Sequence, residues 1–299
     1  MDFVFNQFIS QHPKCQVVSF GAGFDSSFFR LKQQGYTLLK YVEIDFPEVV
    51  QRKWHLIQSN PSCMEHTING NYHLVSADLR DLPTLSSLLC QELKLEVSEP
   101  TLFISECSIT YMDEVSSSKL IQWCADTFHK AVFTVYEQIQ PLDGFGHVMQ
   151  NHFNLLGIPL LSLLTYQNEE SHQLRYIQKG WSSCEVYNMN EFCNLIPQEE
   201  WKRIQRIEQF DEYEGFHWKC SHYVILSATK GLCSPLLPPR DLLPISQTLF
   251  PKELVSWELR ESSVLRYGQA STSVGNKLWM TGGFGARSSQ GHGRLNDLR

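Results

Sequence analysis

The feature that most constrains this chain is a regular alternation, between residue 15 and about residue 140, of short apolar runs with longer segments of helical period. The apolar runs have the length of buried strands, and the segments between them are long enough for crossover helices. This order is typical of a parallel sheet with helices on both faces, so the sequence predicts a doubly wound, mostly parallel α/β fold. The predicted strands span 15–20, 39–44, 72–77, 101–105 and 131–136.

After residue 140 the sequence predicts a helical region that could cover the substrate, then the closing strands of the sheet, and then a tail. The region 144–175 has helical character, and two closing strands are expected at 203–210 and 223–228. We expect the main domain to cover 1–231, because four prolines between 235 and 244 predict a linker over 232–262. Residues 266–285 read as strand, turn and strand, and resemble the opening of a Kelch repeat. Segment 263–299 is therefore predicted to be a truncated Kelch-like piece of a β-propeller.

Composition and charge limit the classes of function. No apolar run approaches the roughly 20 residues needed to cross a bilayer, and the start lacks a secretory pattern, so we expect a soluble cytoplasmic protein. The net charge of -7 gives no general attraction to a phosphate backbone, so a nucleic-acid substrate needs a local basic surface. Nine scattered cysteines without a C-x-x-C pair argue against a disulfide framework or a zinc ribbon.

A glycine turn follows the first predicted strand, in VVSFGAGFDSSFFRL. Gly21 and Gly23 would let a ligand approach the backbone, but enzymes that bind dinucleotides use the same turn. In the dinucleotide fingerprint a third glycine lets the helix and the strand pack closely around a pyrophosphate, whereas here Ser26 stands at that position beside the carboxylate of Asp25. The turn therefore disfavours a pyrophosphate ligand.

Three acids stand at the carboxyl ends of successive predicted strands: Asp45, Asp78 and Glu106. In open α/β sheets this edge binds ligands, and an acidic rim suits S-adenosylmethionine, which carries a sulfonium and an ammonium but no phosphate. We expect Asp45 to accept the ribose hydroxyls. Asp78 is placed to face the adenine amine with Leu79 against the ring, and Glu106 to meet the methionine ammonium or the substrate.

Several motifs in order resemble the leucine carboxyl methyltransferase family over about residues 15–231. They are GAGFDSSFFRLK, YVEIDFPEVVQRK, ADLRDL, ECSITYM and YEQ. The resemblance implies a class I S-adenosylmethionine-dependent methyltransferase. It also implies that the cofactor binds at the positions of Gly21, Asp45, Asp78 with Leu79, and Glu106.

Within that family, the linker and the Kelch-like start resemble the branch that synthesises wybutosine in tRNA. This resemblance implies that the substrate is tRNA-Phe, with methylation of a side-chain carboxylate on a modified guanosine and methoxycarbonylation of its amine. Family members also carry a helical region with a basic pair ahead of the first strand. Because this chain reaches its first strand by about residue 15, we expect weakened cofactor affinity.

Methylation of a carboxylate needs no general base, because the oxygen is already ionised at neutral pH. Catalysis then depends on placing that oxygen about 3 to 3.5 Å from the methyl group. Candidates for a clamp on the substrate are Tyr111, Tyr136, Gln138 and Arg80. No metal is expected, although His217, Cys220 and His222 lie close in sequence, because on a strand their sides would alternate.

Other functions remain open at this stage. A protein carboxyl methyltransferase acting on a phosphatase C-terminal leucine would use the same domain. A truncated isoform without activity could serve as a binding module, and a dehydrogenase is a more distant alternative. A methyl-transfer assay with each substrate separates these classes.

Overall fold

The computed structural model describes residues 1–208, 212–231 and 233–239, together with the backbone of five short strands between 266 and 294. The chain forms two compact units. The first comprises Met1–Gln138, Leu161–Tyr187 and Val224–Leu242, and the second comprises Ile139–Leu160, Asn188–Tyr223 and Leu243–Arg299.

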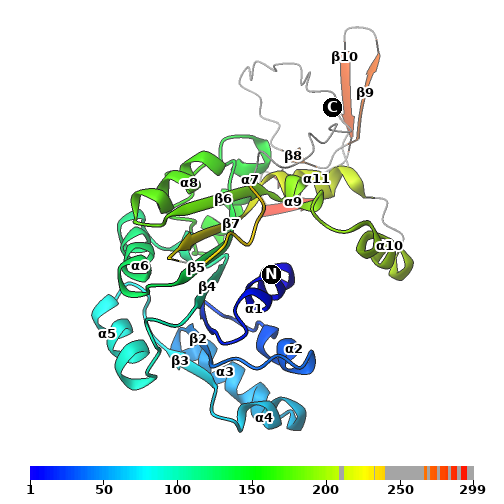
Figure 1. Cartoon of the computed structure of the whole chain (residues 1–299). Coiled ribbons are helices and arrows are strands. Elements are labelled where there is room, and N and C mark those ends of the chain that lie inside the picture. Colours follow the sequence, from blue (N-terminus) through cyan, green and yellow to red (C-terminus); the bar gives the residue numbers. More distant parts are fainter. Residues whose placement is uncertain are drawn as a thin grey trace. The chain divides into compact units, whose positions relative to one another are not determined.

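A seven-stranded sheet in the order β3-β2-β1-β4-β5-β7-β6 is the framework of the fold (Figure 1). Its strands are β1 (Gln16–Phe20), β2 (Lys40–Asp45), β3 (Tyr72–Ser76), β4 (Thr101–Glu106), β5 (Ala131–Gln138), β6 (Ser183–Asn188) and β7 (Tyr223–Lys230). Strands β1 to β5 pair in parallel, as predicted. The order turns back between β1 and β4, and such a switch point opens a crevice at the carboxyl ends of the strands.

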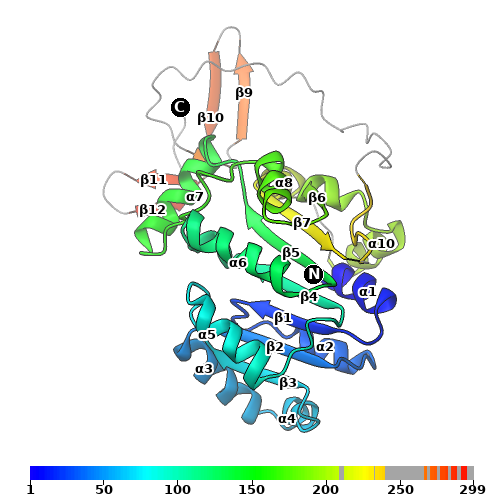
Figure 2. The same ribbon diagram turned by 60° about the vertical axis from the view of Figure 1, so that its left-hand side comes forward.

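Helices cover both faces of this sheet. On one face lie α1 (Asp2–Gln11), α2 (Ser27–Gln33) and α3 (Pro47–Gln58), with α4 (Pro61–Thr67) beside α3 (Figures 1 and 2). On the other face lie α5 (Leu82–Ser86), which continues into a π-helical turn at Ser87–Glu92, then α6 (Glu114–Thr127) and α8 (Glu169–Gln178). No helix in the described part of the chain is long and apolar enough to span a membrane.

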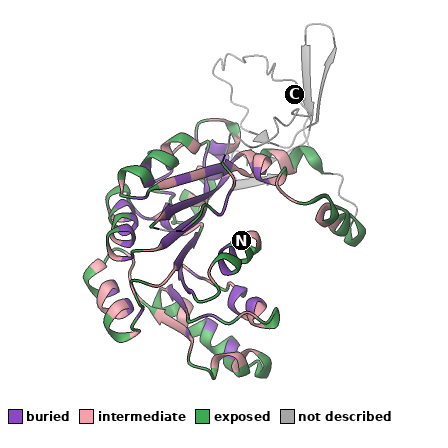
Figure 3. Ribbon diagram, in the orientation of Figure 1, coloured by how far each residue is buried: buried purple, intermediate pink, exposed green. Residues whose placement is uncertain are grey.

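The core of the first unit is aromatic and lies within the sheet. The rings of Phe20 and Phe103 are stacked with centroids 5.6 Å apart, and Phe133 lies 5.8 Å from Phe103. All three side chains are fully buried, so neighbouring parallel strands are joined by side-chain packing as well as by backbone hydrogen bonds. Figure 3 shows this buried centre against the largely exposed helices α3 and α4.

Acidic side chains accept backbone hydrogen bonds at the starts of two helices. Asp113 caps α6, since its carboxylate accepts a hydrogen bond from the Ser116 amide at 2.9 Å. Asp25 accepts from the Ser27 amide at 3.1 Å where α2 begins.

The prediction of a strand at 203–210 is wrong, because α10 (Gln198–Ile207) occupies residues 203–207 of that segment. Two ion pairs join residues three apart on this helix, Lys202 to Glu199 at 2.8 Å and Arg203 to Glu200 at 2.7 Å. Such pairs form on a helix, where residues three apart are neighbours, and do not face each other along a strand. The sheet instead contains β6, which the sequence analysis did not predict.

The second unit contains helices and short strands. They are α7 (Gly144–Leu155), α9 (Met189–Cys193), α10, α11 (Tyr213–Ser221), β8 (Arg266–Tyr267), β9 (Ala270–Val274), β10 (Lys277–Thr281), β11 (Phe284–Arg287) and β12 (Gly291–Arg294). Strands β9 and β10 pair antiparallel, as expected for the two strands predicted in this region. Residues 275–276, where a turn is expected between these two strands, and residues 232 and 240–262 of the predicted linker lie outside the described residues.

The first residues of the predicted linker pack on the first unit. Leu236 and Leu237 are buried, and the Tyr187 hydroxyl donates to the carbonyl of Pro238 at 2.5 Å. The packed part of this unit therefore extends to about residue 239.

Candidate active site

The glycine turn after β1 has the backbone conformation that glycine favours. Gly21 has φ +65° and Gly23 has φ +50°, in the left-handed region. The amides of Gly21 and Ala22 both donate to the carbonyl of Ile44, at 2.8 and 3.2 Å, so the turn is held against the end of β2. A Cβ at Gly21 would lie 2.0 Å from the hydroxyl of Ser108. Glycine is therefore required at position 21 both by the backbone and by its neighbour.

Asp45 contacts the glycine turn. Its Oδ2 accepts from the Gly23 amide at 2.7 Å, and its Oδ1 accepts from the Phe46 amide at 2.7 Å. The carboxylate is half-buried and offers further lone pairs beyond these two bonds. The end of β2 thus presents an oriented anion beside the turn, where the sequence predicted a ribose acceptor.

Asp78 lies two residues beyond the end of β3, and its carboxylate binds Arg80. The carboxylate accepts from the Arg80 amide at 2.9 Å and from the guanidinium at 2.6 to 3.1 Å. These bonds lower the pKa of Asp78, since they stabilise its charged form. Arg80, a candidate for the substrate clamp, is therefore bound in this structure to Asp78, the residue predicted to contact the adenine amine. Leu79 between them is half-buried.

Glu106 and Tyr136 end adjacent strands and are register partners in the pairing of β4 with β5. Glu106 is exposed and Tyr136 is half-buried. The chain then turns at Cys107, which has φ +48° and donates its amide to the Tyr136 carbonyl at 2.8 Å. Tyr111 follows on a 3-10 turn, Ile109–Tyr111, and is half-buried. Both candidate tyrosines thus lie beside the carboxyl ends of β4 and β5.

A cysteine nucleophile is not available at this edge. Burial raises the pKa of the Cys107 thiol to about 12, and the nearby carboxylates of Glu137 and Glu106 act in the same direction. The thiol is therefore neutral near pH 7, whereas the reactive form is the thiolate. Gln138, another candidate for the clamp, is buried and hydrogen-bonds this thiol.

The structure brings the predicted cofactor residues to one edge of the sheet. Asp45 contacts Gly23 directly, and the Ala77 amide, next to Asp78, donates to the Asp45 carbonyl at 3.2 Å. Glu106 ends β4, the neighbour of β1 on the other side. The acidic rim and the open space at Gly23, where no atom lies within 4 Å of an added Cβ, fit a cationic nucleoside.

Ser108, which was not among the predicted site residues, packs against Gly21 from the loop after β4. Nothing in the local sequence marks this contact, because it depends on the left-handed turn at Cys107.

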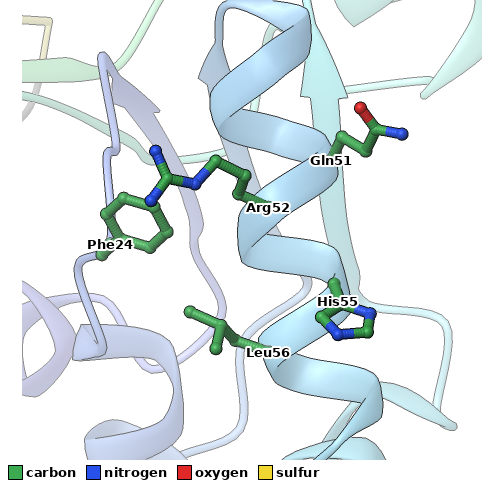
Figure 4. Close-up of a pocket in the computed structure, with 5 residues that line it drawn as sticks. All are labelled: Phe24, Gln51, Arg52, His55 and Leu56. Atoms are coloured by element: carbon green, nitrogen blue, oxygen red, sulfur yellow. The ribbon is translucent and has the colours of Figure 1, made fainter.

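A separate hollow of about 620 Å³ opens beside the glycine turn, between the loop after β1 and helix α3. Figure 4 shows its lining residues, which are Phe24, Gln51, Arg52, His55 and Leu56. The Arg52 guanidinium lies 5.7 Å from the centroid of the Phe24 ring. None of the predicted cofactor residues lines this hollow, so it is distinct from the edge described above.

The histidines of α11 have structural partners within the second unit. His222 is buried and binds the Asp143 carboxylate with Nε2 at 2.9 Å, while its Nδ1 lies 2.7 Å from the Trp218 carbonyl. His217 pairs with Asn190 at 2.9 Å. His217 lies on a helix and His222 directly after it, whereas the sequence predicted a strand there. The described residues contain no group of three or more His, Cys, Asp or Glu suited to hold a metal ion.

Solved structures with the same fold include a candidate methyltransferase of Thermobifida fusca, with a TM-score of 0.52 and 11% identity over 77% of this chain and 79% of that one. A DUF574-family protein of Streptomyces avermitilis has a TM-score of 0.51 and 11% identity over 77% and 81%. These similarities support the class I methyltransferase fold.

Sequence comparison identifies closer relatives. Residues 1–125 match the family model for leucine carboxyl methyltransferase. Human tRNA wybutosine-synthesizing protein 4 is 36% identical over 95% of this chain, and rat leucine carboxyl methyltransferase 1 is 34% identical over 73%. The chain spans 45% of the human relative and 70% of the rat enzyme. The chain therefore belongs to the leucine carboxyl methyltransferase family of S-adenosylmethionine-dependent methyltransferases.

Proposed function

We propose that this chain methylates the side-chain carboxylate of a modified guanosine in tRNA-Phe, the precursor of wybutosine, and takes part in methoxycarbonylation of the neighbouring amine. The observation that carries the proposal is the extent of similarity. The human wybutosine-synthesizing relative aligns with 95% of the chain, whereas the rat leucine carboxyl methyltransferase aligns with 73%. A tRNA substrate also favours the predicted cytoplasmic location.

The proposed cofactor site comprises Gly21, Asp45, Asp78, Leu79 and Glu106. Support comes from the contact of Asp45 with the Gly23 amide and from the common edge that the three acids share. S-adenosylmethionine supplies an electrophilic methyl group when it is bound. Asp45 would orient the ribose, Asp78 and Leu79 the adenine, and Glu106 the methionine ammonium or the substrate.

The residues of the chain then have to position an anion that is already nucleophilic. Tyr111 and Tyr136 could each donate a hydroxyl hydrogen bond to the substrate carboxylate and hold one oxygen in line with the methyl group. Orientation of this kind can contribute on the order of 7 to 11 kcal/mol to lowering the barrier. Arg80 can join the clamp only if it exchanges its bonds to Asp78.

A second function has support of its own. The match to the leucine carboxyl methyltransferase model, together with 34% identity over 70% of the rat enzyme, favours a protein substrate with a C-terminal leucine carboxylate. Both substrates present an ionised carboxylate, so the chemistry at the sheet edge would be the same. A chain that binds without transferring a methyl group is the third candidate.

The domain assignment is part of the proposal. Residues 1–231 would form the methyltransferase domain and 263–299 a truncated Kelch-like segment, and within the proposed linker of 232–262 the residues 236–238 contact the first unit. The antiparallel pairing of β9 with β10 is compatible with the first strands of a propeller blade.

A methyl-transfer assay tests the substrate directly. The chain is incubated with methyl-labelled cofactor and either tRNA-Phe that carries the wybutosine precursor or a phosphatase subunit with its native C-terminal leucine. We expect label in the tRNA only. Label in the phosphatase tail alone would replace the first function by the second. Absence of label from both, with cofactor bound, would favour a binding module.

A further inference from the structure

The hollow beside the glycine turn adjoins the proposed cofactor site but is lined by different residues. One wall is Phe24, which directly follows Gly23, and the Gly23 amide binds the Asp45 carboxylate. The other wall is helix α3, through Gln51, Arg52, His55 and Leu56 (Figure 4). A ligand in the hollow would therefore lie next to the proposed ribose acceptor without occupying its place.

Helix α3 presents these lining residues outward because its opposite face is buried. Lys53 and Ile57 are buried, and the Lys53 ammonium pairs with the Glu43 carboxylate on β2. At 3.6 residues per turn, the lining residues lie on the other side of the helix. They thus project from an element that is anchored to the sheet before any ligand binds.

Phe24 offers an aromatic face to the hollow. Its side chain is 53% exposed although it is apolar, and the neighbouring Leu56 is 57% exposed. The Arg52 guanidinium lies 5.7 Å from the centroid of the Phe24 ring, within the range of a cation–π contact (Figure 4). Unpaired bases of RNA stack on aromatic rings and on guanidinium planes of this kind.

The charge of Arg52 is available to a ligand. Among the described residues it forms no ion pair with any carboxylate, including that of Glu48 one turn earlier on α3. The predicted cofactor acids lie at the rim, where they would repel a phosphate. A phosphate is therefore favoured in the hollow and disfavoured at the rim. In a chain with a net charge of -7, Arg52 and His55 supply the local basic surface that a nucleic-acid substrate needs.

We propose that this hollow binds an unpaired nucleotide of the RNA substrate, with its base stacked on Phe24 and its phosphate at Arg52 and His55. The inference rests on the proposed tRNA function and deepens it, because it assigns where RNA near the modified guanosine is held. Stacking tolerates any base, and a phosphate contact carries no sequence information. The hollow therefore fixes the position of the RNA and does not read its sequence.

Three variants of the full chain separate stacking from charge. Phe24→Leu removes the aromatic ring and keeps an apolar side chain. Arg52→Gln removes the guanidinium charge and keeps a polar side chain. Lys119→Gln is the matched control, because it removes one positive charge from an exposed position on α6, on the opposite face of the sheet.

The first measurement is the Kd for labelled precursor tRNA-Phe at several salt concentrations, read by fluorescence anisotropy. We expect the Kd to rise about fivefold or more in Phe24→Leu, because stacking on the ring is lost. Arg52→Gln should also weaken binding, and it should reduce the slope of log affinity against log salt by about 0.7, the value for one phosphate contact on a single strand. Lys119→Gln should bind like the wild type.

Two further measurements identify what is bound. Single-stranded oligouridine should compete with the tRNA for the wild type more strongly than duplex RNA of the same length, because only unpaired bases can stack on Phe24. The Kd for S-adenosylhomocysteine should be unchanged in both hollow variants, since no predicted cofactor residue lines the hollow. An unchanged Kd also shows that the variants are folded.

The outcomes distinguish this inference from the proposed function. Wild-type affinity for tRNA in both hollow variants would overturn the inference, whereas methylation of the tRNA by the same proteins would uphold the function. Equal weakening in Lys119→Gln would overturn the inference as well, because net charge would then be the cause. Weakening confined to the hollow variants, in a wild type that transfers no methyl group to the tRNA, would support the hollow and refute the proposed function.

Other occupants of the hollow would give different results. Unchanged RNA affinity in Phe24→Leu, with weaker binding of a phosphatase C-terminal peptide, would assign the hollow to a protein substrate. Unchanged RNA affinity with loss of a wild-type dimer, measured by sedimentation, would assign it to a second copy of the chain. Either result would overturn the inference.

Discussion

At the scale of single residues, the site depends on contacts between backbone and side chain. The Asp45 carboxylate is oriented by two amides, and the Gly21 backbone is confined by the Ser108 side chain. The identity of each residue is therefore set by a close neighbour as well as by the proposed ligand.

Replacement of Gly21 by alanine is expected to lower the free energy of unfolding by about 1 to 3 kcal/mol and to abolish cofactor binding. The added Cβ would meet the Ser108 hydroxyl, and the alanine backbone would have to adopt a φ of +65°. Thermal unfolding and titration with S-adenosylhomocysteine measure the two effects.

Gly23→Ala is the matched control for this clash. Position 23 has a similar φ of +50°, but no atom lies within 4 Å of an added Cβ. A loss of stability in Gly23→Ala as large as in Gly21→Ala would assign the effect to backbone strain alone.

Replacement of Asp45 by asparagine is expected to weaken S-adenosylhomocysteine binding about ten- to a hundredfold, because hydrogen bonds to a charged acceptor contribute about 1.5 to 3 kcal/mol. Glu48→Gln on α3 removes one negative charge from an exposed position near Asp45 and should leave the Kd unchanged. A similar loss in both variants, measured by calorimetry, would indicate a long-range effect of net charge.

The sequence predicted part of this site. Asp45 and Asp78 could be assigned because acids at the ends of parallel strands meet at one edge. The contacts of Ser108 with Gly21 and of Ser162 with Thr110 could not be predicted, since both join segments that are distant in sequence. The pairing of Arg80 with Asp78 also depends on a turn geometry that the residue order does not determine.

At the scale of elements, helix α3 is joined to β2 by a buried ion pair. Lys53 and Glu43 are 3% and 0% exposed, and the Tyr72 hydroxyl donates to the Glu43 carboxylate at 2.8 Å. Glu43 lies two residues before Asp45 on β2, so the pair links α3 to the strand that presents the proposed ribose acceptor.

Replacement of Lys53 by methionine is expected to lower the free energy of unfolding by about 3 to 5 kcal/mol, because the Glu43 carboxylate would remain buried without its cation. The double variant Glu43→Gln with Lys53→Met should recover most of this loss. Chemical denaturation of the single and double variants measures both values. Equal instability of the two variants would show that Lys53 contributes by packing and not by charge.

Element prediction succeeded where the hydrophobic pattern was continuous and failed where it was short. The parallel strands from β1 to β5 were predicted to within two residues at each end. On α10, the isoleucines at 204 and 207 are three apart, a spacing that suits a helix, and this distinguishes the segment from a strand. Strand β6 has the mixed sequence SCEVYN, which gives too little apolar character to be recognised alone.

At the scale of the whole molecule, the stability of the chain should depend on pH through Glu137. Its pKa is raised from 4.5 to about 7 in the fold, so the folded state retains a proton that the unfolded state releases between these values. The contribution to stability is therefore complete below pH 4.5 and is lost as the pH rises to about 7.

The stability that is lost as the buried Glu137 ionises between pH 4.5 and about 7 amounts to about 3 kcal/mol. Urea denaturation of the wild type and of Glu137→Gln at several pH values measures it by subtraction, since other titrating groups are common to both proteins. The wild type should lose stability relative to the variant as the pH rises. Parallel pH profiles would show that Glu137 titrates at an ordinary value.

The sequence predicted the class of the sheet, but not the places of its last two strands. The order β5-β7-β6 reverses the order along the chain, so it depends on long-range packing.

The same strand order has a consequence for synthesis on the ribosome. Strand β1 pairs with β2 on one side and with β4 on the other, and β4 begins only at Thr101. At about 5 to 20 residues per second, roughly 3 to 12 s separate the completion of β2 from that of β4. During this interval the growing chain carries an unpaired strand edge, which is a template for association with other chains. Translation of this protein should therefore be more sensitive to loss of chaperones before β4 emerges than after it.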